Sequence, residues 1–141
     1  MKFDTDPLEV LKVIDNINSY TNNEFFDEVG DDAPNIYMKG YCYFFAMMLK
    51  RLYPEGTLMI SEDMTHVLLN INGINYDACG WFEEKCHKVD KQDMAHIDFA
   101  LKGQYPEDIP YLEDKFNRLI DGVIQKYYTP KTTLEEKGVQ L

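Results

Sequence analysis

The segment HVLLNINGINYDACG, residues 66–80, decides the fold of this chain. At its centre lies Asn72-Gly73, a dipeptide that favours two-residue β-turns because both residues tolerate positive φ angles. Apolar residues alternate with polar ones on both sides of this turn, which is typical of strands with one buried face. The segment therefore predicts an antiparallel β-hairpin.

The turn also fixes which residues of the two strands face each other. With the turn so placed, Leu68 faces Asp77 and His66 faces Cys79. Because side chains alternate between the two faces of a strand, His66 and Asp77 share a face as diagonal neighbours, with Cα atoms about 7 to 8 Å apart. The opposite face is apolar and consists of Val67, Leu69, Ile71, Ile74, Tyr76 and Ala78.

A second segment, GYCYFFAMMLKRLYP at residues 40–54, predicts a helix over residues 41–53. The segment is apolar on nearly every side of the helix, which is typical of a helix buried in a protein core. Lys50 and Arg51 lie near its C-terminal end, where the helix dipole favours cations. Pro54 then ends the helix.

The rest of the chain supplies outer helices and one further strand. The sequence predicts an amphipathic helix over residues 7–19, a strand over residues 57–60, and a last helix from Asp108 to Thr129-Pro130. Other parts are less regular: residues 24–39 predict irregular chain, residues 82–90 a third strand or a loop, and residues 94–101 a short helix.

These elements together predict an α+β fold. The buried helix that carries Cys42 packs on a small antiparallel sheet, and the outer helices flank this pair. We expect a single domain over residues 1–130, followed by a flexible tail over residues 131–141.

The composition is that of an acidic globular protein. The 141 residues include 25 acidic and 14 basic ones, for a net charge of −11, and 45% are hydrophobic. This charge disfavours direct nucleic-acid binding, which needs a basic face.

Compartment and redox state also follow from the sequence. No apolar run approaches the ~20 residues of a membrane span, and the start MKFDTDPLEV lacks the apolar core of a secretory signal. The cysteine count is three, an odd number that favours reduced thiols over a disulfide framework. We therefore expect a cytoplasmic protein that does not bind membranes.

Three residues form a candidate catalytic group. Cys42 begins the buried helix, where a helix N-terminus and a nearby imidazolium lower the pKa of a thiol. His66 and Asp77 lie together on the hairpin, and a carboxylate that holds one ring nitrogen leaves the other to face the thiol. The backbone N–H groups of Cys42 and Tyr43, and the side chain of Asn35, are candidate donors to an oxyanion.

Each of these residues also has a purely structural interpretation. Cysteine is among the most buried residue types, and Cys42 shares a helical stripe with Ala46 and Leu49. His66 fits a hydrogen-bonded strand residue, and Asp77 fits a solvated acid. The convergence of three such groups favours the catalytic interpretation.

The two segments quoted above resemble the papain-like and transglutaminase-like cysteine hydrolases, in the compact form found in bacterial and phage proteins. In that pattern a cysteine begins a central helix with Ala and Leu on its packing face, a histidine heads a strand, and Asp or Asn follows on the adjoining strand. The pattern maps to Cys42, Ala46, Leu49, His66 and Asp77.

This resemblance implies acyl transfer through a thioester on a protein or peptide substrate. The reaction would be hydrolysis of a peptide or isopeptide bond, deamidation of glutamine, or transfer to an amine. It implies no cofactor and no metal.

Other interpretations remain open. A zinc site is one, although the spacing does not match the paired ligands of structural zinc sites; its candidate ligands are His66, Cys79, Cys86, His87 and His96. In a second, Cys79 replaces Cys42 as the working thiol. In a third, the protein is an acidic binding or inhibitor protein of phage origin that acts on a basic protein surface. A protein that keeps the fold but has lost the reaction is also compatible with the sequence.

Overall fold

The computed structural model describes residues 3–24, 33–105 and 108–129. Its helices are α1 (Pro7–Glu24), α2 (Ala33–Ile36), α3 (Cys42–Leu52), α4 (Lys91–Gln104) and α5 (Ile109–Val123), with π-helical turns η2 (Tyr37–Tyr41) and η3 (Ile124–Tyr128). Its strands are β1 (Thr57–Ser61), β2 (Val67–Ile71), β3 (Ile74–Asp77), β4 (Gly80–Trp81) and β5 (Cys86–Lys88). The predicted α+β class is confirmed.

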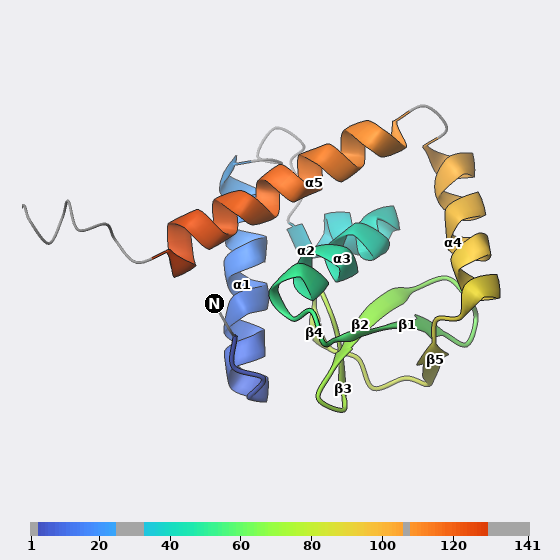
Figure 1. Cartoon of the computed structure of the whole chain (residues 1–141), viewed down its shortest axis with the longest axis horizontal. Coiled ribbons are helices and arrows are strands. Elements are labelled where there is room, and N and C mark those ends of the chain that lie inside the picture. The colour runs from blue at the N-terminus through green and yellow to red at the C-terminus, as the bar shows by residue number, and fades with distance from the viewer. Residues whose placement is uncertain (1–2, 25–32, 106–107, 130–141) are drawn as a thin grey trace, which may run out of the picture.

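Helix α3 is the centre of the molecule. It packs against the sheet on one side and against α5 on the other, while α1 crosses α5 (Figure 1). Its buried side chains include Phe45 and Leu49, each at most 2% exposed. The helix is therefore the buried helix that its apolar sequence predicts.

The predicted hairpin is confirmed in its register. Leu69 pairs with Tyr76 and Ile71 with Ile74 across β2 and β3. The turn residues Asn72 and Gly73 have φ angles of 50° and 90°, as two-residue hairpin turns require. The apolar face of the hairpin lies against α3 and contributes Leu69, Ile71, Tyr76 and Ala78 to the main core.

The sheet is curled. The strand order is β4-β3-β2-β1-β5, so that β4 and β5, which follow each other in the chain, lie at opposite edges. In a flat sheet β3 and β5, three strands apart, would lie about 14 Å from each other. The Asn75 amide on β3 nevertheless lies 2.9 Å from Cys86 Sγ on β5, which requires the sheet to bend.

The connector continues the ladders at both edges of the sheet. Phe82 donates its backbone N–H to the Asn75 carbonyl at 2.9 Å, next to the β3–β4 pairs, and Glu62 donates to the Lys85 carbonyl at 3.3 Å, next to the β1–β5 pairs. Leu68 points to the face of the sheet opposite to α3 and is nevertheless completely buried.

The first helix is longer than its sequence predicts. Helix α1 continues past residue 19 to Glu24 because Thr21 is buried and hydrogen bonded. The Thr21 hydroxyl donates to the Ile17 carbonyl at 2.7 Å and contacts the Tyr37 hydroxyl at 2.7 Å. A tertiary contact thus extends the helix through residues that would end it in isolation.

The prediction of irregular chain over residues 24–39 is wrong for its second half. Residues 33–41 form α2 and η2, and the Asn22 side chain accepts the Ala33 N–H at 2.6 Å. Residues 25–32 lie outside the described residues, as does the predicted tail at 131–141.

Helix α4 is also longer than predicted. It starts at Lys91 rather than residue 94 because Asp90 and Asp93 form a capping box, with reciprocal bonds of 2.8 and 3.0 Å. It packs across β1 and β2 through Ile97. None of the described helices combines the length and the apolar character that crossing a bilayer requires.

Candidate active site

A break in the helical chain places Cys42 at the start of α3. Gly40 has a φ angle of +126°, and Tyr41 leaves the helical conformation with φ −107° and ψ 14°. A Cβ atom on Gly40 would lie 2.5 Å from Nε2 of Gln104. Glycine is required here for its backbone conformation, and any larger residue would also displace the Gln104 side chain.

The structure brings Cys42, His66 and Asp77 together. His66 Nε2 lies 2.9 Å from Asp77 Oδ2, and the two side chains are only 12% and 6% exposed. The thiol of Cys42 is hydrogen bonded to the His66 side chain. Because Asp77 occupies Nε2, Nδ1 is the ring nitrogen that faces the sulfur. This is the arrangement that the hairpin register predicts.

Two contacts hold the carboxylate and the ring in place. The second Asp77 oxygen accepts the Cys79 N–H at 2.8 Å. The ring of Phe82 packs on the imidazole of His66, with centroids 5.3 Å apart and planes tilted by 55°. The His66 ring therefore lies between a fixed acid and an aromatic wall, which restricts its rotation.

The electrostatics favour a thiolate and imidazolium pair. Burial raises the pKa of the Cys42 thiol, but the His66 hydrogen bond and charge, with the N–H groups of Val67 and Tyr43, lower it overall. Burial lowers the pKa of His66, but hydrogen bonds to Asp77 and Cys42 and the charges of both raise it to about 9. Each group thus stabilises the charged form of the other.

A cavity of about 100 Å³ lies beside Cys42, between the start of α3, strands β1 and β2, and helix α4. Cys42, Tyr43 and Gln104 all line it. Asn35 is exposed on α2 and is not among the lining residues. The geometry therefore gives Gln104, rather than Asn35, as the side-chain amide near the thiol.

Sequence reasoning missed Gln104 and the Val67 N–H. Gln104 lies beyond the predicted end of the short helix at residue 101, and only the packing of α4 brings it to Gly40. The Val67 N–H is a backbone group directly after His66, so that the hairpin register could have indicated it. Among the described residues, no group of three or more His, Cys, Asp or Glu side chains has an arrangement that could bind a metal ion.

Cys79 lies apart from the cavity. It is exposed in the turn between β3 and β4, whereas Cys42 is half-buried beside the cavity. No disulfide joins the three cysteines, all of which lie in the described part of the chain.

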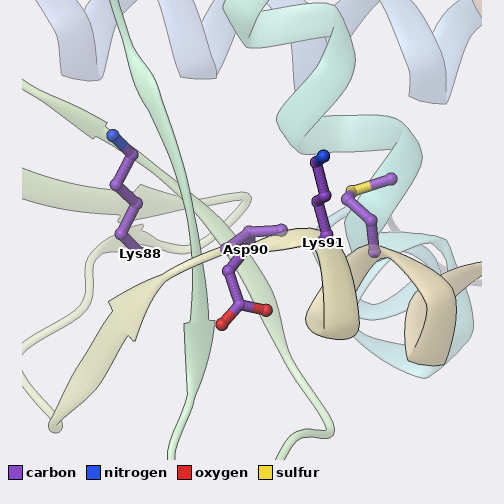
Figure 2. Close-up of a pocket in the computed structure, with 5 residues that line it drawn as sticks. Lys88, Asp90 and Lys91 are labelled. Atoms are coloured by element: carbon purple, nitrogen blue, oxygen red, sulfur yellow. The ribbon is translucent and has the colours of Figure 1, made fainter.

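A larger hollow, of about 680 Å³, lies where β5 meets α4. Figure 2 shows Lys88 and Lys91 extending to one side of this segment and the Asp90 carboxylate pointing to the other. Asp90 already accepts the Asp93 N–H as the helix cap. The lining of this hollow includes no cysteine, serine or histidine, and its size alone gives it no chemistry.

Comparison with known proteins corrects the family expected from the sequence. No curated protein and no solved structure matched the chain. The family model that matches, over residues 13–121, is described as Phage YunG-like protein. The assignment to papain-like or transglutaminase-like cysteine hydrolases is therefore wrong; it rested on a short motif, and such catalytic arrangements recur on unrelated folds. The chain belongs to the Phage YunG-like protein family.

Proposed function

We propose that this protein is a thiol-dependent acyl-transfer enzyme that cleaves an amide bond in a protein or peptide, by hydrolysis or by glutamine deamidation. The observation that carries the proposal is the hydrogen-bonded chain from Asp77 through His66 to Cys42 at the edge of a cavity. In this proposal Cys42 is the nucleophile, His66 the acid and base, and Asp77 the group that orients the imidazole.

The first half of the reaction forms a thioester. The Cys42 thiolate attacks the carbonyl carbon, a C–S bond forms, and the carbonyl electrons move to oxygen. His66 then gives its proton to the leaving nitrogen as the C–N bond breaks, and an amine or ammonia departs.

The second half restores the enzyme. Neutral His66 takes a proton from water, the oxygen of that water adds to the thioester carbonyl, and the C–S bond breaks. The sulfur leaves as a thiolate beside the newly formed imidazolium. The acid product is released, and the resting ion pair is regenerated.

The oxyanion of each intermediate needs hydrogen-bond donors beside the sulfur. The Tyr43 N–H already interacts with the Cys42 sulfur at the start of α3. The amide of Gln104 lies against Gly40 and lines the same cavity. We assign these two groups to the oxyanion, with Gln104 in the role predicted for Asn35.

Acylation by p-nitrophenyl acetate tests the proposal. We expect acetylation of Cys42, detected by mass spectrometry, with release of p-nitrophenolate that continues as the thioester hydrolyses. Cys42→Ala abolishes both, whereas the matched variant Cys79→Ala removes an exposed thiol outside the cavity and keeps both. Acetylation of Cys79 in preference to Cys42, or turnover that survives in Cys42→Ala, would refute the proposal.

The acetylation experiment also tests the alternative hypothesis that the protein is an acidic binding protein without catalytic activity. A family named for phage proteins is compatible with that hypothesis as well. A protein that acts only by binding a basic surface needs no reactive thiol, so that Cys42 would show no preference over Cys79.

A further inference from the structure

The cavity beside Cys42 has apolar walls built by three different elements. Ile60 of β1, Val67 of β2 and Ile97 of α4 line it, and each is at most 5% exposed. The lining includes no Asp, Glu, Lys or Arg side chain. A charged side chain packed against this aliphatic wall would therefore lose its hydration without gaining a partner from the wall.

The polar side chains of the lining leave this apolar character intact. His96 is exposed, and its Nε2 lies 3.2 Å from the Met64 carbonyl. Gln104 is exposed and lies against Gly40. Thr65 is also exposed, Tyr43 is partly exposed, and Cys42 is the reacting thiol itself. The polar groups thus mark the mouth of the cavity, and the buried aliphatic groups form its inner wall.

The size of the cavity limits what it can hold. An engineered protein cavity of about 150 Å³ holds a benzene molecule, whereas this one encloses about 100 Å³. It therefore has room for a branched aliphatic group of three or four carbons, whereas an aromatic ring would not fit fully inside it.

We propose that this cavity binds a small aliphatic side chain of the acyl donor, adjacent to the carbonyl that Cys42 attacks. The inference rests on the proposed function and gives its substrate class: peptides with valine, leucine or isoleucine at the acyl position. The lining by Cys42 itself places the bound side chain next to the reacting sulfur.

N-acetylated amino-acid chloromethyl ketones test this specificity. The Cys42 thiolate displaces chloride from these reagents, so that a C–S bond forms as the C–Cl bond breaks. We expect the valine reagent to alkylate Cys42 at least about tenfold faster than the phenylalanine and lysine reagents. Iodoacetamide, which carries no side chain, measures the intrinsic reactivity of the thiol.

Two variants of α4 provide the structural test. Ala100 is exposed at the cavity and Ala95 is exposed away from it on the same helix, so that both tolerate leucine. We expect Ala100→Leu to narrow the entrance and lower the valine-to-iodoacetamide rate ratio about tenfold. Ala95→Leu, the matched control, leaves that ratio unchanged.

The outcomes separate the two proposals. Equal alkylation rates for the valine, phenylalanine and lysine reagents would overturn the aliphatic pocket. Equal valine-to-iodoacetamide rate ratios in Ala100→Leu and Ala95→Leu would do the same. In either case, acetylation of Cys42 by p-nitrophenyl acetate would still support the proposed enzyme. Failure of every reagent, p-nitrophenyl acetate included, to modify Cys42 would overturn both.

Discussion

Replacing Asp77 by asparagine tests whether the carboxylate holds the ion pair. The rise of the His66 pKa from 6.5 to about 9 corresponds to a bias of about 300-fold, or about 3 kcal/mol, toward the imidazolium. Asp77 and Cys42 are the partners that raise it. Burial opposes this rise, so the two partners together contribute more than the net shift. If they contribute equally, Asp77→Asn lowers the equilibrium constant for the ion pair by at least about 20-fold.

The pH dependence of Cys42 alkylation by iodoacetamide measures this effect. The lowered pKa of Cys42 means that its thiolate persists as the pH falls below the range of ordinary thiols. The raised pKa of His66 means that the imidazolium persists up to about pH 9. In the native protein the rate should therefore change little between these limits, whereas the rate of an ordinary thiol rises about tenfold per pH unit up to about pH 8.5.

In Asp77→Asn the alkylation rate near pH 6 should fall by about 20-fold or more, and the profile should resemble that of an ordinary thiol. The matched control is Asp114→Asn, which removes an exposed carboxylate that pairs with Arg118 on α5. Mass spectrometry of the Cys42 peptide gives the rate for each protein. Superimposable profiles for Asp77→Asn and the native protein would show that the carboxylate does not support the ion pair.

Two glycine substitutions and one amide substitution give further tests. Gly122→Ala should lower the free energy of unfolding by about 1–3 kcal/mol, because its Cβ would overlap the Tyr20 ring. A Cβ atom at Gly103 would face open space, so Gly103→Ala should raise the free energy of unfolding by about 0.5–1 kcal/mol. Equal urea unfolding midpoints for the two variants would contradict the packing of Gly122 against Tyr20. Gln104→Ala should slow acetylation of Cys42 by p-nitrophenyl acetate about 100-fold. Alkylation by iodoacetamide forms no oxyanion and should keep its rate, so equal slowing of both reactions would exclude an oxyanion role.

The hairpin could be predicted from the sequence because its information is local. Asn72 and Gly73 fix the turn, the turn fixes the register, and the register puts His66 and Asp77 on one face. The start of α3 was likewise predictable to within one residue, because Gly40 marks the break before Cys42.

The remaining parts depend on contacts between distant residues. Helix α1 extends to Glu24 through the contact of Thr21 with Tyr37, which no window of sequence contains. Gln104 reaches Gly40 only through the packing of α4 on β1 and β2. The family assignment was wrong for a related reason: a short catalytic motif does not determine the topology of the fold in which it occurs.

The short edge strands of the sheet also affect how the protein behaves at high concentration. Its two outermost strands, β4 and β5, have only two and three residues, and they present few unpaired backbone groups to a neighbouring molecule. Long open edges are the usual sites of strand-by-strand aggregation. The described sheet therefore offers little template for fibril growth, and concentrated solutions should resist this form of self-association.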